Sequence, residues 1–304
     1  MNPKSAPALN RREFLGTAAG AATAALCSLA APSTVHGAEE KNSKPASVGL
    51  IDTNVNLGRW PFRRLPLDET PLLVAKLRAG GVAFALAGSF ETLLHKDISA
   101  VNARLADECH QRGENLLVPV GAINPMLPDW EEDLRRCAEI HGMPGIRLHP
   151  NYHGYTLKDP IFERVLTLAG ERNMLVQLAV SMEDERTLHP LVNVPPTDVA
   201  PLPAILARFP RTRLQLLNVF RTVRGKLLQD LAAARVRFEI ATLEGVAGIG
   251  NLLEQINESC LLFGSNAPFY YFESSQLKLQ ESPLNERQLR AIREGNARSF
   301  MSVH

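Results

Sequence analysis

Two short stretches of the sequence carry side chains that could move a proton. His149 and His153 stand in HPNYHGYTL (149–157), and Asp184 stands in SMEDERTLHP (181–190). A histidine beside a carboxylate is a plausible general base, because the carboxylate fixes the tautomer of the imidazole and raises its basicity. We therefore take His149, His153 and Asp184 as candidate catalytic residues.

The same stretches carry groups that could bind a substrate. The guanidinium of Arg147 or Arg186 could hold a carboxylate through two parallel hydrogen bonds. Tyr152 and Glu183 belong to the same two loops. A second interpretation stays open, in which the acidic run is a solvated loop and the tyrosine is a packing residue.

A third stretch, LGRWPFRR (57–64), adds aromatic and basic side chains. Trp60 offers a ring face and Arg59 a guanidinium, so this loop could form one wall of a binding site. Equally, the Trp-Pro-Phe sequence could pack within its own loop.

Side-chain amides recur where apolar runs end. Asn54 and Asn56 stand two apart in IDTNVNLGRWPF (51–62), and Gln177, Asn218 and Asn266 fall in or just after three later runs. Each amide offers both a donor and an acceptor, so a ring of them could hold a polar ligand or a water network. They could also simply bond one another.

The elements that must position these residues follow from the periodicity. Short β-rich runs alternate with amphipathic helical stretches, which is typical of a (β/α)8 TIM barrel, an α/β fold. No G-x-G-x-x-G follows the first run, which argues against an open dinucleotide-binding sheet. In a barrel, chemistry sits at the carboxyl ends of the strands. The eight expected strands are 48–54, 82–90, 116–125, 145–150, 174–180, 213–219, 236–242 and 261–268.

The amino terminus is expected to be an export signal. Residues 1–38 join a basic start containing Arg11-Arg12 to an Ala-rich run, as in twin-arginine signals, which direct folded proteins to the periplasm or outside the cell. We expect a linker over 39–47 and one barrel domain over 48–304. The 33 Lys and Arg residues nearly balance the 32 Asp and Glu residues, so no nucleic-acid or membrane partner is expected. The sequence gives no oligomeric state.

Several stretches together resemble one enzyme family. MPGIRLHP, the closing LLFGSNAP and the terminal IREGNARSF are similar to the amidohydrolase-related family, whose members include aminocarboxymuconate semialdehyde decarboxylase and several lactonases. The resemblance runs from about residue 50 to residue 300. It implies a TIM barrel of the metal-dependent hydrolase type.

The resemblance also implies where a metal would be held. The family's His-x-His falls on Asn54 and Asn56, its two later histidines on Gln177 and Asn218, and its aspartate on Asn266. Neutral amides without an acid leave a divalent charge uncompensated. We therefore expect no metal and no other cofactor.

Two hypotheses of function follow. The first is an exported hydrolase that acts without a metal on a small polar, carboxylated ester or lactone. His149 or His153 would be the base, helped by Asp184, and Arg147 or Arg59 would steady the oxyanion. The second is a non-catalytic barrel that binds a sugar or sugar acid through its amides.

Overall fold

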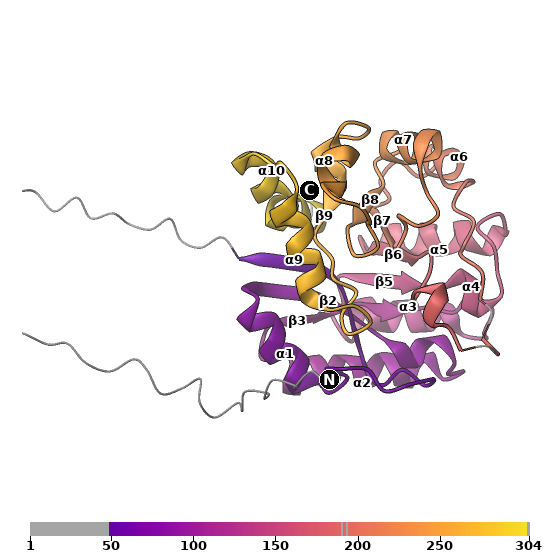
Figure 1. Ribbon diagram of the computed structural model, residues 1–304. Coiled ribbons are helices and arrows are strands. Elements are labelled where there is room, and N and C mark those ends of the chain that lie inside the picture. Colours follow the sequence, from indigo (N-terminus) through magenta and orange to yellow (C-terminus); the bar gives the residue numbers. More distant parts are fainter. Residues whose placement is uncertain (1–48, 190, 193, 303–304) are drawn as a thin grey trace, which may run out of the picture. The chain divides into compact units, whose positions relative to one another are not determined.

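The computed structural model describes residues 49–189, 191–192 and 194–302. Within this part, parallel strands alternate with helices along the chain (Figure 1). The predicted signal (1–38) and linker (39–47) lie outside the described residues. No helix in the described part is both long and apolar enough to cross a membrane.

The strands are those that the apolar runs predicted, and most are shorter than expected. They are β1 (Leu50–Leu57), β2 (Val82–Ser89), β3 (Leu117–Pro119), β4 (Gly121–Ala122), β5 (Gly145–Leu148), β6 (Leu175–Ala179), β7 (Leu214–Leu217), β8 (Arg237–Glu239) and β9 (Leu261–Leu262). Only Val120 separates β3 from β4, so these two share the third position. Val120 still donates its N–H to the carbonyl oxygen of Ala87 at 2.8 Å.

Helices and helical turns connect the strands. They are α1 (Thr70–Ala79), η1 (Phe90–Leu93), α2 (Ile98–Arg112), α3 (Trp130–Glu139), α4 (Pro150–His153), α5 (Pro160–Glu171), η2 (Glu185–Thr187), α6 (Leu202–Leu206), α7 (Gly225–Ala233), α8 (Gly248–Leu253), η3 (Glu258–Cys260), α9 (Phe272–Glu281), α10 (Glu286–Arg290), the π-helical turn η4 (Ala291–Gly295) and α11 (Asn296–Met301).

Hydrogen bonds close the strands into a barrel. All strand pairs are parallel and follow the chain order, β1 to β3 in one sheet and β4 to β9 in the other. The segment after β9 returns to β1, because Asn56 donates its N–H to the Ala267 carbonyl at 2.8 Å and Asn266 donates to the Asn54 carbonyl at 2.8 Å. The (β/α)8 barrel predicted from the periodicity is confirmed.

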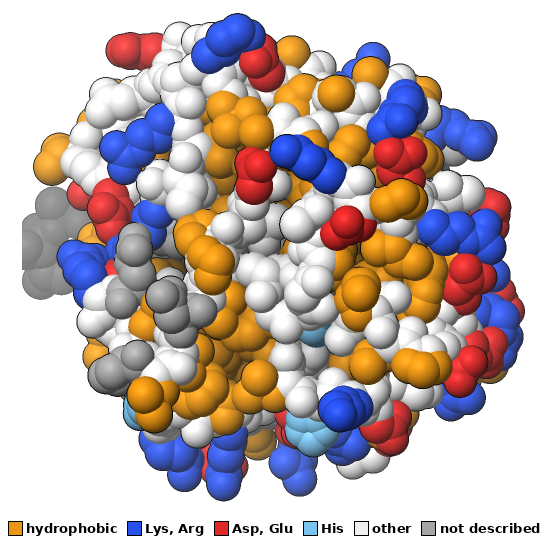
Figure 2. Space-filling view, turned by 90° about the vertical axis from the view of Figure 1, so that its right-hand side faces the viewer, with side chains coloured by type: hydrophobic (Ala, Val, Ile, Leu, Met, Phe, Trp, Pro, Cys, Tyr) orange, Lys and Arg blue, Asp and Glu red, His pale blue; other side chains and the backbone are white. Residues whose placement is uncertain are grey.

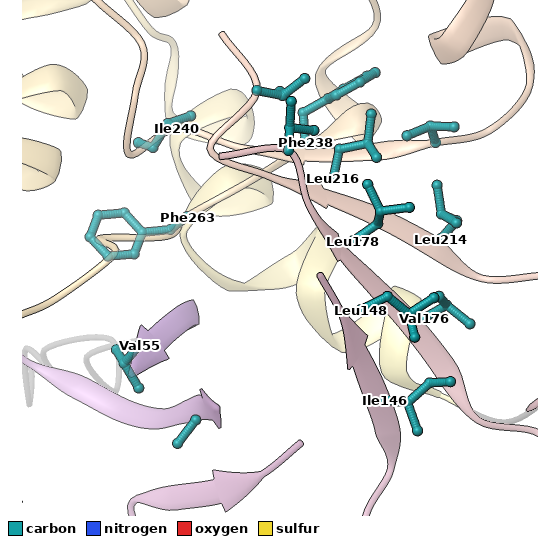
Figure 3. Packing of buried hydrophobic residues seen from close by; sticks show 14 of the residues in the cluster. Val55, Ile146, Leu148, Val176, Leu178, Leu214, Leu216, Phe238, Ile240 and Phe263 are labelled. Atoms are coloured by element: carbon teal, nitrogen blue, oxygen red, sulfur yellow. The ribbon is translucent and has the colours of Figure 1, made fainter. Parts of the chain in front are cut away.

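Alternation along the strands sorts the side chains into two environments. Ile146 and Leu148 of β5, with Val176 and Leu178 of β6, belong to the main apolar cluster (Figure 3). Residues of α5 such as Phe162 belong to the same cluster. A smaller cluster of Ile51, Leu86, Val120, Leu175 and Leu262 is separate from it. Alternate positions of β5 to β7 carry polar side chains: Arg147 pairs with Gln177, and Gln177 with Gln215.

Asp52 helps to join β1 to the last strand. Its Oδ1 accepts the N–H of Asn54 at 3.1 Å and that of Ser265 at 3.0 Å. Burial raises the pKa of Asp52 to about 7, although hydrogen bonds from Ser265 and Asn54 favour the ionised form. Near neutral pH the protonated acid and the carboxylate of this fully buried residue are therefore both populated.

Replacing Asp52 by Asn should stabilise the protein at pH 8 and change little at pH 4. The pKa is higher in the folded chain than the ordinary 3.8, so wild-type stability is full near pH 4 and falls as the pH rises toward 7. Because one pKa unit corresponds to about 1.4 kcal/mol, the gain at pH 8 is of the order of a few kcal/mol. Urea unfolding at both pH values measures it.

Asp68→Asn is the matched control, with the opposite sign. A hydrogen bond from Arg64 lowers the pKa of Asp68, so this substitution should cost stability at pH 8 and little at low pH. Equal effects of Asp52→Asn at pH 4 and pH 8 would contradict the assignment.

Candidate functional site

The five amides lie at the carboxyl end of the strands and are all buried. Asn54 and Asn56 come from β1 and Gln177 from β6. Asn218 directly follows β7, and Asn266 lies after β9, just before the Ala267–Pro268 bond. Each is at most 2 % exposed. They form two hydrogen-bonded pairs and one bridge rather than a single ring, so no one point collects all five side chains.

Both pairs run in the same direction, with the β1 asparagine as the donor. Asn56 Nδ2 donates to Asn266 Oδ1 at 3.1 Å, and Asn54 Nδ2 donates to Asn218 Oδ1 at 3.1 Å. Their remaining donors turn to loop carbonyls: Asn218 Nδ2 donates to Ser181 at 2.8 Å and Asn266 Nδ2 to Met182 at 3.1 Å. The pairs therefore tie the strand ends to the loop that follows β6.

Arg147 lies between the amides of β1 and β6. Its Nη1 donates to Asn56 Oδ1 at 2.8 Å and its Nε donates to Gln177 Oε1 at 2.9 Å. Gln177 Nε2 donates in turn to Gln215 Oε1 at 2.9 Å, and Gln215 Nε2 donates to Thr53 Oγ1 at 2.7 Å. Arg147, placed by prediction in a binding site, is 1 % exposed inside the barrel.

This centre does not fit a divalent metal. Two of the oxygens that would have to face the ion, on Asn56 and Gln177, accept from a cationic guanidinium instead. Within the described ranges, no group of three or more His, Cys, Asp or Glu side chains is placed to hold a metal ion. Neutral amide oxygens beside the charge of Arg147 cannot compensate the charge of a divalent ion, so they would bind it weakly.

Glu239 is the carboxylate next to the amides. It lies on β8, fully buried, and its Oε1 accepts the N–H of Asn218 at 2.6 Å and Asn54 Nδ2 at 3.4 Å. Burial raises its pKa, while the hydrogen bonds from Asn218 and Ala241 and the charge of Lys278 oppose that shift. Glu239 is thus held by several donors and is not directed at open space.

A cluster of apolar side chains meets the amides at Met182. Trp60 and Phe269 have ring centroids 4.9 Å apart, Phe90 and Phe269 4.7 Å, and Trp60 and Phe90 5.5 Å. We call these three residues the aromatic cap. Met182, whose carbonyl binds Asn266, packs in the same cluster. Trp60 is therefore a buried packing residue, 2 % exposed, and not an exposed wall.

The two histidines after β5 are buried beside this centre. His149 begins α4 and is 1 % exposed, and the rings of His149 and His153 are 5.8 Å apart. His153 Nε2 lies 3.0 Å from the carbonyl oxygen of Thr92. Burial, with the nearby charges of His153 and Arg147, holds the pKa of His149 well below its usual value. Burial also lowers the pKa of His153.

Asp184 does not meet either histidine. Its carboxylate accepts from Arg186 Nη2 and from Arg221 Nη2, each at 2.6 Å, and these bonds hold its pKa below the usual range. The expected pairing of a histidine with Asp184 is therefore not formed. Two cations, one of them 37 residues further along the chain, compete for this acid.

Two predicted arginines also lie away from the centre. Arg59 has a side chain 62 % exposed and donates to Glu69 at 2.8 Å, in a different pocket that also contains His95. Arg186 has a side chain 75 % exposed at the rim. Neither is placed to steady an oxyanion near the histidines.

Open space occurs at the rim instead. A pocket of about 220 Å³ lies among the loops after β5, β6 and β7. Figure 2 faces the end of the barrel where α4 follows β5, and it shows apolar side chains near the middle of this face. Tyr152 and Glu183, both predicted binding residues, line the pocket. Its other lining residues are Asn151, Ser181, Met182, Leu188, Val194, Pro195, Pro196, Arg221 and Thr222.

Several of these pocket residues could not be singled out from the sequence. Arg221 follows β7 in an ordinary loop, yet it bridges Asp184 and Glu244 through Nη2 at 2.6 and 2.7 Å. Its Nε has no hydrogen-bond partner among the described residues, and neither has Asn151 Oδ1. The one available signal was position, because both residues follow a barrel strand.

Comparison with known proteins places the fold. Among solved structures, 5-carboxyvanillate decarboxylase from Sphingomonas paucimobilis is similar with a TM-score of 0.67 and 13 % identity, covering 85 % of this chain and 100 % of that one. The enzyme of the same name from Novosphingobium aromaticivorans, a variant with bound manganese and 3-methoxy-4-hydroxy-5-nitrobenzoic acid, gives 0.66 and 14 %, covering 84 % and 98 %. 2,6-Dihydroxybenzoate decarboxylase from Rhizobium gives 0.61 and 15 %, covering 82 % and 98 %.

No curated protein matches this chain in sequence. The family model described as amidohydrolase matches residues 57–301, which is most of the chain and nearly all of the described barrel. That match agrees with the resemblance carried by MPGIRLHP, LLFGSNAP and IREGNARSF. The chain belongs to the amidohydrolase family.

Proposed function

We propose that this chain binds a small carboxylated molecule in the rim pocket and that its barrel centre carries no metal chemistry. The observation that carries the proposal is the use of the amide oxygens: Asn56 and Gln177 bind Arg147 rather than facing open space. Binding is thereby displaced outward, to the loops where a pocket exists. The proposal is therefore the second hypothesis, a ligand-binding barrel, with the ligand in the rim pocket and not on the amides.

The size of the rim pocket limits the ligand. Its volume of about 220 Å³ is below the range of roughly 300 to 1,000 Å³ that accommodates drug-sized molecules. Similar solved structures are named as decarboxylases of carboxyvanillate and dihydroxybenzoate, which are small hydroxylated aromatic acids. These names support an aromatic acid as the first ligand class to test, with sugar acids as the second.

The lining offers complementary groups for such an acid. Arg221 lines the pocket with a side chain that is 18 % exposed, so its guanidinium could contribute to a carboxylate contact. Ser181 and Thr222 donate their hydroxyls to the carbonyls of Asn218 and Val219 at 3.1 Å each, so their oxygens remain as acceptors for ligand hydroxyls. Met182 and the prolines supply the apolar surface for a ring.

A second candidate function, hydrolysis of a small ester or lactone, has one observation in its favour. The Nδ1 atoms of His149 and His153 are buried without a hydrogen-bond partner among the described residues. A neutral imidazole with a free nitrogen can accept a proton from water. For this function the structure around His149 must open, because His149 is only 1 % exposed.

Export remains part of the proposal. Arg11-Arg12 and the Ala-rich run after them support the twin-arginine route, which would deliver the folded barrel outside the cytoplasm.

Ligand binding in the rim pocket should depend on Arg221. In a thermal-shift screen of the full chain against hydroxylated benzoates, sugar acids and their neutral amides, the acids should raise Tm and the amides should not. Arg221→Gln should reduce the ligand-induced shift by at least about half, because the charge-assisted contact is lost.

Arg224→Gln, an exposed neighbour, is the matched control and should leave the ligand-induced shift unchanged. Prior treatment with a chelator should also leave it unchanged. An acid-induced shift that survives Arg221→Gln or disappears with the chelator would contradict the proposal.

If the chain hydrolyses esters or lactones through His149, His149→Ala should lower kcat by about 100-fold or more, the usual contribution of a general base. His110→Ala, on the exposed face of α2, provides the control for a histidine remote from the site. The measurement is the rate at which each variant hydrolyses small carboxylated esters and lactones. The Tm of each variant verifies that it is folded. Unchanged turnover in His149→Ala removes this candidate.

Replacing both Arg11 and Arg12 by Lys should keep the full-length chain in the cytoplasm, because twin-arginine export depends on that pair. Cell fractionation and immunoblotting of both forms measure the distribution. Equal export of the two forms would argue against this route.

A further inference from the structure

Arg147 is the largest fully buried side chain in the described part of the chain. It extends from β5 into the barrel, where an unpaired cation would cost several kcal/mol or more. Its surroundings must therefore accommodate a guanidinium. Three features do so: hydrogen-bond acceptors, the space left by a glycine, and nearby acidic residues.

Acceptors from two other strands meet the guanidinium. Nε donates to Gln177 Oε1 on β6 at 2.9 Å, and Nη1 donates to Asn56 Oδ1 on β1 at 2.8 Å and to the Val55 carbonyl at 3.1 Å. Nη2 lies 3.5 Å from the Leu86 carbonyl of β2. The planar fork of an arginine suits acceptors arranged around its edge, whereas an ammonium group would reach only part of them.

The chain also leaves room for the guanidinium. Gly88 on β2 faces it so closely that an added Cβ would lie 2.5 Å from Nη1 and 2.8 Å from Cζ. The φ of Gly88 is not in the left-handed region, so space and not backbone conformation accounts for this glycine. A β-strand otherwise loses packing at a glycine.

The charges around Arg147 complete the site. Asp52 and Glu239, both fully buried, are the acids whose charges act on Arg147. Neither accepts a hydrogen bond from the guanidinium, so the neutral amides provide the direct side-chain contacts.

We infer that the Arg147 guanidinium is the resident cation of this barrel, held in a site formed by Asn56, Gln177 and Gly88 that positions the amides in place of a divalent ion. Arg147 is a positioning residue under this inference. The inference is independent of the rim pocket, so failure of the ligand proposal would leave it standing.

Chemical rescue tests the inference. Arg147→Ala in the full chain should lower Tm and leave a cavity lined by acceptor oxygens. Millimolar guanidinium chloride, far below denaturing concentrations, should then raise Tm by roughly 2 to 4 °C over equal sodium chloride. The wild-type chain should show no such gain. Equal effects of the two salts on Arg147→Ala would overturn the inference.

Phe162→Ala is the matched control, because it also empties a large, fully buried position but one surrounded by the main apolar cluster. It should lose stability without rescue by guanidinium. Rescue of both variants alike would mean a general salt effect and would also overturn the inference.

A double-mutant cycle covers the case in which Arg147→Ala is too unstable to purify. Gly88→Ala should lower Tm in the wild-type background, and less so when Arg147 is Lys, whose smaller head group leaves more space near Gly88. Arg147→Lys alone should also lower Tm, because the fork is lost. Equal costs of Gly88→Ala in both backgrounds, or a wild-type Tm for Arg147→Lys, would overturn the inference.

Discussion

The burial of one guanidinium constrains the whole carboxyl end of this barrel. Arg147 needs hydrogen-bond acceptors that it cannot obtain from water, and it takes them from Asn56 and Gln177. Once those oxygens are used, the amide nitrogens must find acceptors too: Asn56 turns to Asn266, and Gln177 turns to Gln215 and the Thr53 carbonyl at 2.8 Å. The network therefore runs from β1 to the segment after β9. Asn54 Oδ1 and Asp52 Oδ2, both buried, have no hydrogen-bond partner among the described residues.

The bonding of Asn56 and Gln177 to Arg147 has a consequence for where function can lie. Polar groups that already have partners gain little from a ligand, because binding would exchange one hydrogen bond for another. The aromatic cap packs in the same cluster as Met182, whose carbonyl accepts the remaining donor of Asn266. Space for a small molecule lies at the rim, in the pocket that Arg221 and Asn151 help to line. The resemblance to decarboxylases thus describes the fold better than the site.

The fold could be predicted from the sequence, and so could the five amide residues near the barrel mouth. The hydrogen-bond partners of those amides could not. Strand positions follow from apolar runs, and asparagines at strand ends must lie near the barrel mouth. However, Asn218 and Asn266 take left-handed φ values of 56° and 52°, a conformation that Asn tolerates well. Backbone geometry and ligand binding both favour asparagine there, so residue type alone could not separate them. The pairing of Asp184 with Arg221 depends on two loops meeting in space, which periodicity does not encode.

Charge balance gives a physical reason for amides rather than acids around Arg147. The centre already has two buried carboxyl groups, Asp52 and Glu239, for the one guanidinium, with Lys278 acting on Glu239 from α9. With the pKa of Asp52 near 7, protonation removes part of the excess negative charge near neutral pH. An additional aspartate at position 266 would have to be protonated or unpaired, because no further buried cation adjoins Asn266 among its described hydrogen-bond partners. A divalent ion would supply the missing charge in a metal-binding centre. Without such an ion, neutral amides around Arg147 add no further negative charge to an interior that already contains Asp52 and Glu239.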